Sequence, residues 1–164
     1  MTTDRIEKTI FLNAPVAKVW RAISDAGEFG RWFGMSFDGG FATGAKLTGT
    51  IVMTEVDPDI AKAQKPHVGK SFEIWIETLE PERQVSFRWH PFAIDTGADY
   101  SKEPTTLVVF NIAPEEKGTR LTITESGFDR IPLQRRAAAF AANDGGWQAQ
   151  TQLLKKYLAN YQDG

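Results

Sequence analysis

The order of hydrophobic and polar residues predicts a strand and two short helices at the start of the chain. Residues 6–11 alternate loosely between apolar and polar side chains, which predicts a strand that ends at Asn13. Pro15 then occupies a position that a first helical turn tolerates. Apolar residues recur at helical spacing as far as Ile23, so we expect a helix that closes near residues 25–27. The segment "EFGRWFG" predicts a second short helical turn that stops at Gly34.

The middle of the chain has the pattern of antiparallel strands. Residues 45–56, "AKLTGTIVMTEV", predict a strand, and the polar residues 57–69 with their two prolines predict a loop. Residues 70–81 and 83–92 predict a hairpin that turns around Pro81 and Glu82. Residues 104–128 predict a second hairpin, with its turn at residues 114–118. These segments together predict one antiparallel sheet.

A long helix is expected at the end of the chain, with Pro132 marking its start. Phe140, Trp147, Leu154 and Leu158 fall on one face of this helix. A helix and a sheet that each have one apolar face can bury both by packing together. We therefore predict a single α+β domain over residues 1–164 with a helix-grip arrangement. A curved antiparallel sheet of about six to seven strands wraps around the C-terminal helix, and two short helices follow the first strand.

Composition narrows the classes of function. The net charge of −2 argues against a general nucleic-acid binder, which would have a basic surface. The absence of cysteine excludes disulfides, thiolate metal sites and a cysteine nucleophile. The sequence has neither a signal peptide nor a run of about 20 apolar residues, so we expect no membrane insertion. We predict a cytoplasmic protein that is a monomer or a dimer.

Three segments resemble a known superfamily: "LNAPVAKVWRAISDAGEFGRWFG", "GTRLTITESGF" and "DGGWQAQTQLLKKYL". They are similar to the START-like helix-grip (SRPBCC) superfamily, in the branch of the homologues of the heat-shock-protein ATPase activator. The resemblance implies a small-molecule pocket between the sheet and the C-terminal helix. The eukaryotic co-chaperone carries a separate N-terminal chaperone-binding domain, whereas this chain starts at the first strand. We therefore do not expect chaperone activation, although a chaperone partner stays an alternative.

The C-terminal helix gives internal support for a cavity. Asn143 shares a face with Phe140 and Trp147, and an amide on that face needs a partner or water. Gly145 and Gly146 each cost about 1 kcal/mol against alanine in a helix, so they either kink the helix or clear space. In the alternative interpretation a kink turns Asn143 to solvent. Pockets are lined mainly by apolar and aromatic side chains. The predicted ligand-binding residues are Trp32, Phe33, Phe37, Phe41, Trp75, Phe87, Trp89, Phe110, Phe140, Asn143 and Trp147.

The chain offers few candidates for catalysis. His67 and His90 are its only histidines and are too few for a zinc site, so we expect no metal and no cofactor. His67 is expected at the surface, and strand alternation places His90 opposite Trp89. Glu73 and Glu77 are expected on a solvated face, and Arg135 in an ordinary salt bridge.

We predict binding of a small, largely hydrophobic molecule and assign no catalytic residue. The first alternative is an enzyme of the polyketide-cyclase or hydratase kind, which needs an ionisable group in the cavity. Arg88, His90 and Glu125 are the candidates for that group, and Arg88 has a second interpretation as a structural partner of Glu125 or Asp129. The second alternative is a stress-linked co-chaperone.

Overall fold

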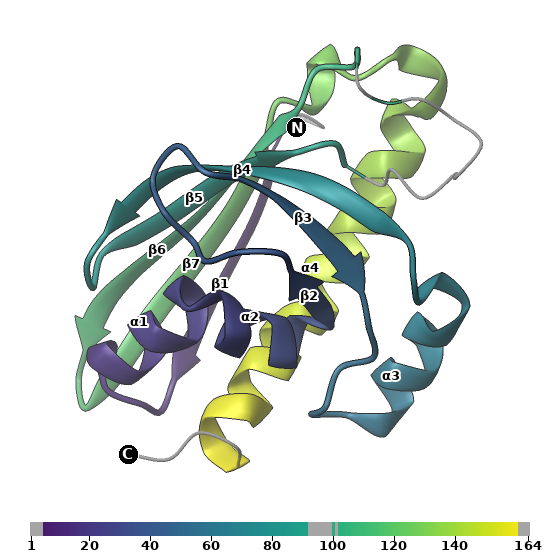
Figure 1. Ribbon diagram of the computed structural model, residues 1–164. Coiled ribbons are helices and arrows are strands. Elements are labelled where there is room, and N and C mark those ends of the chain that lie inside the picture. The colour runs from purple at the N-terminus through teal and green to yellow at the C-terminus, as the bar shows by residue number, and fades with distance from the viewer. Residues whose placement is uncertain (1–4, 92–99, 101, 161–164) are drawn as a thin grey trace.

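The structure, a computed structural model, describes residues 5–91, 100 and 102–160. Within these residues seven strands form one antiparallel sheet in the order β1-β7-β6-β5-β4-β3-β2 (Figure 1). The elements, in chain order, are β1 (Arg5–Leu12), α1 (Val16–Ser24), α2 (Ala26–Phe33), β2 (Met35–Phe37), β3 (Lys46–Ile51), α3 (Pro58–Gln64), the 3-10 turn η1 (Lys65–His67), β4 (Ser71–Glu80), β5 (Gln84–Trp89), β6 (Thr106–Glu115), β7 (Gly118–Ser126), the 3-10 turn η2 (Phe128–Arg130) and α4 (Leu133–Asn160).

The sheet curves around α4, and α1 and α2 cover one end of its inner face (Figure 1). One row across five strands shows how the inner face is built, because its members pair in register: Ile6, Glu125, Val108, Phe87 and Ile76. All five are at most 2% exposed. The predicted α+β helix-grip fold is confirmed. Among the described helices, none combines the length and the apolar composition needed to span a bilayer.

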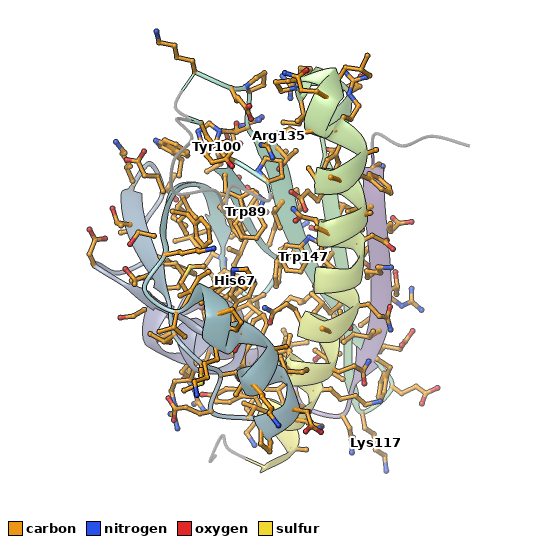
Figure 2. All side chains as sticks on the ribbon, turned by 90° about the vertical axis from the view of Figure 1, so that its right-hand side faces the viewer. His67, Trp89, Tyr100, Lys117, Arg135 and Trp147 are labelled. Carbon is orange, nitrogen blue, oxygen red and sulfur yellow. The ribbon has the colours of Figure 1, made fainter. Side chains whose placement is uncertain are left out.

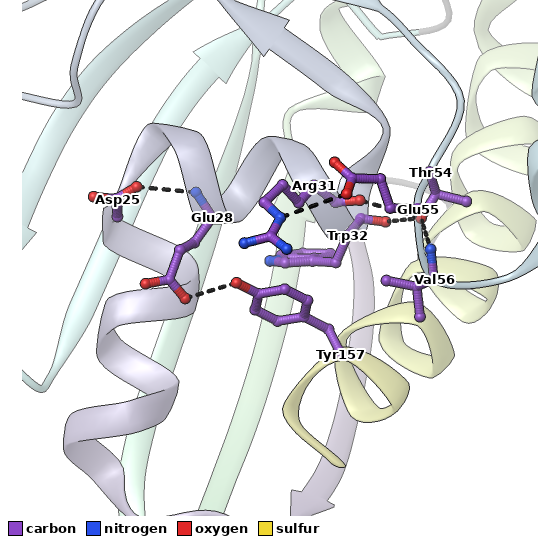
Figure 3. Close-up of polar contacts among 8 residues, drawn as sticks. All are labelled: Asp25, Glu28, Arg31, Trp32, Thr54, Glu55, Val56 and Tyr157. Carbon is purple, nitrogen blue, oxygen red and sulfur yellow. Dashed lines mark hydrogen bonds and ion pairs between the residues drawn. The ribbon is translucent and has the colours of Figure 1, made fainter. Parts of the chain in front are cut away.

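The two short helices are separated by a single residue that serves both. Asp25 ends α1, and its side chain accepts a hydrogen bond from the backbone N–H of Glu28 at 2.9 Å, which caps the start of α2 (Figure 3). Gly34 ends α2 with a φ of 90°, a left-handed conformation that glycine adopts without strain. Tyr157 of α4 donates to the Glu28 carboxylate at 2.8 Å and so joins α4 to α2 (Figure 3). The predicted stop at Gly34 is confirmed.

The segment between β3 and β4 differs from the sequence-based expectation. Within the predicted loop of residues 57–69, residues 58–67 form α3 and η1, and β3 ends at Ile51 instead of continuing to residue 56. Asp57 caps α3 by accepting hydrogen bonds from the N–H groups of Asp59 and Ile60 at 2.9 and 3.2 Å. Pro58 occupies the first turn, where proline needs no donor. Since α3 has no buried residue, its sequence lacks the apolar stripe from which a helix is recognised.

Helix α4 runs from Leu133 to Asn160 as one helix, through Gly145 and Gly146. A Cβ added at either glycine would meet no described atom within 4 Å. The glycines therefore do not make room for a packed ring of the described residues. Asn143 does not turn to solvent either, because its side-chain amide donates to Glu125 on the sheet.

A cleft between the last helix and the sheet

A cleft of about 420 Å³ opens between α4, α3 with η1, and the inner face of the sheet. In Figure 2, His67, Trp89 and Trp147 lie along the opening between α3 and α4, with Arg135 and Tyr100 at its upper end. The apolar part of the wall comes from seven different elements. Its members are Phe33, Met35, Ile51, Ala63, Phe72, Trp89 and Ala142. Polar side chains complete the wall: Gln64, His67, His90, Asn143 and Gln150.

Two glutamine side chains fix one corner of the cleft by meeting at a backbone carbonyl. The carbonyl oxygen of Phe33, at the end of α2, accepts from Gln64 Nε2 and from Gln150 Nε2, each at 3.1 Å. Gln64 Oε1 in turn accepts from the N–H of Thr54 at 2.8 Å. These contacts connect α2, α3 and α4 where the three helices border the cleft. The left-handed Gly34 makes this possible because it ends α2 with the Phe33 carbonyl accessible.

Two tryptophans form an aromatic wall. Trp89 from β5 and Trp147 from α4 stack with ring centroids 5.7 Å apart and an interplanar angle of 29°. Phe33 contacts both rings, with centroid distances of 6.2 Å to Trp89 and 6.0 Å to Trp147. A smaller hollow of about 80 Å³ lies against this group. Trp147 lines this hollow together with five residues that also line the larger cleft. The indoles thus separate the cleft from the interior of the protein.

Behind the indoles lies a carboxylate that is 0% exposed, Glu125 of β7. Its Oε1 accepts from Trp147 Nε1 at 2.8 Å and from Asn143 Nδ2 at 2.9 Å. Its Oε2 accepts from Trp89 Nε1 at 2.8 Å, from Thr106 Oγ1 at 2.5 Å and from Asn143 Nδ2 at 3.0 Å. Indole and amide N–H groups can only donate, so the arrangement is complementary to an ionised carboxylate. The donors that hold it are neutral.

Two buried polar atoms at the cleft have no hydrogen-bond partner within the described part of the chain: Gln150 Oε1 and His90 Nδ1. A buried polar atom without a partner costs free energy, so both atoms are candidates for contact with a bound molecule. Burial lowers the pKa of His90 below its ordinary value of 6.5; Arg135 lowers it further, whereas Glu103 and Glu73 act to raise it. His90 is therefore mainly neutral at pH 7.

The sequence matches, over residues 13–159, the model of the family described as "Activator of Hsp90 ATPase homolog 1-like protein". The chain belongs to this family. The membership confirms the resemblance to the heat-shock-protein ATPase activator homologues and agrees with the helix-grip fold of the structure. No match was found among curated proteins.

Solved structures share the fold of this family member at low sequence identity. Protein MLL2253 from Mesorhizobium loti is 22% identical with a TM-score of 0.69, over 97% of this chain and 99% of that one. A protein from Arthrobacter aurescens is 17% identical with a TM-score of 0.71, over 99% of this chain and 94% of the other. DynU16, from the dynemicin biosynthetic locus, is 22% identical with a TM-score of 0.67 over 96% of this chain. The chain spans only 48% of DynU16.

The structure of this activator-homologue domain brings some of the predicted site residues together. Phe33, Trp89 and Asn143 line the cleft, and Trp147 borders the adjoining hollow. The others lie elsewhere. Phe140 packs on Phe128 with centroids 5.1 Å apart. Away from the cleft, in the aromatic core or packed against it, are Trp32, Phe37, Phe41, Phe87 and Phe110.

Trp75 lies on the opposite face of the sheet, since it alternates with the inward Ile74 and Ile76. There it contacts Lys46, whose Nζ is 5.9 Å from the ring centroid. Its neighbours Glu73 and Glu77 form ion pairs on that same outer face, with Lys46 at 2.7 Å and with Arg88 at 2.6 Å. The solvated face predicted for the two glutamates is confirmed, and the ion pairs among the described residues do not join Arg88 to Glu125 or Asp129.

Several residues of the cleft were missed or misplaced by the sequence analysis. His90, which follows the end of β5 at Trp89, lines the cleft together with Trp89, and its ring also contacts the outward Trp75 at a centroid distance of 5.7 Å. His67 lines it too, rather than lying free at the surface, because η1 brings it inward. Gln150 follows Trp147 by three residues and so shares its helix face, but it is not among the predicted binding residues. The described residues hold no group of three or more histidine, cysteine, aspartate or glutamate side chains that could bind a metal.

Proposed function

We propose that this domain binds a small, largely apolar molecule in the cleft between α4 and the sheet. The observation that carries the proposal is a cleft of about 420 Å³ that is bordered by the aromatic wall and by a buried acceptor without a partner among the described residues, Gln150 Oε1. Small-molecule sites are typically concave and apolar, with a few polar groups that set the orientation of the ligand. A polar atom that stays unpaired in the free protein gains a partner when such a ligand donates to it.

The placement of the ionisable side chains supports binding over catalysis. Arg88 lies on the outer face in an ion pair with Glu77. Glu125 lies behind the tryptophans, and each of its oxygens already accepts at least two hydrogen bonds. A general acid or base must come within hydrogen-bond reach of the group that reacts, which leaves His90 alone of the three candidates. A co-chaperone role stays a prediction from the family resemblance.

Intrinsic tryptophan fluorescence tests the proposal, because the Trp89 ring lines the cleft. A library of small amphipathic and aromatic molecules is screened for a change in emission and for a rise in Tm. A ligand at about 100 times its Kd stabilises the folded state by roughly 2.7 kcal/mol, which a thermal shift detects. Trp89→Phe should remove most of the fluorescence response. Trp20→Phe, at a half-buried position on α1 away from the cleft, should keep it. A library that moves neither emission nor Tm contradicts the proposal.

A further inference from the structure

We infer that the ligand carries a protonated amine beside its apolar body, and that the ammonium group lies at the Trp89–Trp147 wall near Gln150. The inference rests on the proposed function and adds the chemical class of the ligand to it. Three features of the described residues carry it: a buried anion behind the wall, the absence of fixed positive charge on the wall, and an acceptor without a donor.

The buried anion is Glu125, which takes part in none of the ion pairs found among the described residues. The neutral donors around it satisfy its oxygens but leave its net charge in place. In a low-dielectric interior that charge acts over a longer range than it does in water. Trp89 and Trp147 direct their N–H groups toward it, so the positive ends of both indole dipoles point away from the cleft. The negative ends of these dipoles therefore point away from Glu125, which favours a cation on the other side of the rings.

The wall of the cleft holds no opposing fixed charge. Its described lining contains no lysine, arginine, aspartate or glutamate, and burial keeps His90 mainly neutral at pH 7 by lowering its pKa. Arg135, beside His90, pairs with Glu103 at 2.7 Å. Lys70 keeps its positive charge, with its Nζ 3.1 Å from His67 Nδ1, but it lies on the η1 side of the cleft. The fixed charge closest to the tryptophan wall is thus the carboxylate of Glu125.

The third feature selects a donor over an acceptor on the ligand. Gln150 is held by its Nε2 contact to the Phe33 carbonyl at 3.1 Å, so its Oε1 stays directed away from that bond with no partner. An ammonium group has three N–H donors and no acceptor, which suits this oxygen. A carboxylate head would meet an acceptor and the field of a second carboxylate. An alcohol could donate to Gln150 but would gain nothing from the charge.

A matched series of probes tests the inference: phenylbutylamine, phenylbutanol and phenylbutyrate share one apolar body and differ in the charge of the head. Their Kd values are measured by calorimetry at pH 7 and low salt. We expect the amine to bind about tenfold tighter than the alcohol, and the acid to bind most weakly. If the alcohol or the acid binds as tightly as the amine, the inference is overturned and the proposed function stands. If none of the three binds, and the library screen also fails, the proposed function fails and the inference with it.

Variants at Gln150 and Glu125 test whether these two side chains produce the preference for an amine. Gln150→Leu should weaken the amine at least about fivefold, whereas Gln152→Leu, an exposed glutamine on the same helix, should leave its Kd unchanged. An unchanged Kd in Gln150→Leu overturns the role of that oxygen. Glu125→Gln should bring the amine and alcohol affinities to within about twofold of each other. If that variant does not fold, Gln150→Glu decides: it must tighten the amine about tenfold and weaken the acid, and any other result overturns the inference.

Discussion

Glu125 has a fully buried carboxylate whose partners are all hydrogen-bond donors. Each end of its carboxylate faces an indole N–H, Trp147 on one oxygen and Trp89 on the other. A glutamine of the same shape must turn its NH2 group toward one of the two, and neither indole can accept a hydrogen bond. At least one buried donor then loses its acceptor, whichever way the amide is turned.

We therefore expect Glu125→Gln to lower the free energy of unfolding by about 2 kcal/mol, the middle of the range of about 1–3 kcal/mol for an unsatisfied buried group. Urea denaturation measures the change, and near-UV circular dichroism should show altered tryptophan packing. Glu77→Gln is the matched control, because Glu77 is an exposed carboxylate that pairs with Arg88 on the outer face. Its loss should cost less than about 1 kcal/mol. An equal loss of unfolding free energy in the two variants would mean that the buried hydrogen bonds of Glu125 stabilise the protein no more than an exposed ion pair does.

The position of Glu125 could be predicted from the sequence, but its partners could not. In "LTITES" the inward residues are Leu121 and Ile123, so alternation places Glu125 on the inner face as well. Its hydrogen-bond donors come from β5, β6 and α4, which meet only in the folded chain. Likewise, the sequence places Asn143 as a polar residue on an inward helix face, whereas its partner Glu125 depends on the alignment of α4 against β7.

At the scale of elements, the two glycines in α4 form a natural pair for comparison. Both are exposed, and a Cβ on either would meet no described atom within 4 Å, but only Gly146 lines the cleft. Alanine in place of an exposed helical glycine stabilises a helix by about 1 kcal/mol. Gly145→Ala and Gly146→Ala should therefore raise Tm by similar amounts, as a thermal melt would show.

Ligand binding should separate the two variants. The methyl group at residue 146 extends into the cleft, so Gly146→Ala should weaken a cleft ligand severalfold, whereas Gly145→Ala should not change its Kd. Gly146→Leu, with a larger side chain at the same point, should weaken binding further. A ligand that is indifferent to both changes at residue 146 does not occupy the described cleft.

Elements with a strong apolar pattern or clear end signals were predicted well, and α3 was not. The start of α4 after Pro132, the end of α2 at Gly34 and the β4–β5 turn all follow from local chemistry. Helix α3 buries no residue, so the period on which the helix predictions relied is absent from it. The sequence did contain its start signal, since Asp57 followed by Pro58 is a typical cap and first turn. Pro66, one of the two prolines that favour a loop in the sequence, instead lies in η1.

At the scale of the whole molecule, two kinds of contact hold the elements together. Buried packing joins the sheet to α4, whereas polar contacts attach α3. The inner face of the sheet packs on α4 through side chains that are almost fully buried. Helix α3 is attached through Gln64, which bridges Phe33 and Thr54, and through the ion pair between Asp57 and Lys156. Elements with few buried contacts open at a lower free energy than the core of the same domain. One wall of the cleft is therefore expected to open independently of the rest.

Hydrogen exchange followed by mass spectrometry measures this local opening. Peptides that cover residues 58–67 should exchange faster than peptides from β6 and β7, and Gln64→Ala should accelerate them at least about fivefold while the strands keep their protection. Lys62→Ala, at an exposed position of the same helix, is the control and should have a much smaller effect. A cleft ligand should slow exchange in α3 more than in the strands, because it bridges α3 to α4. Uniform acceleration of α3 and the sheet in Gln64→Ala would show instead that α3 opens only when the whole domain unfolds.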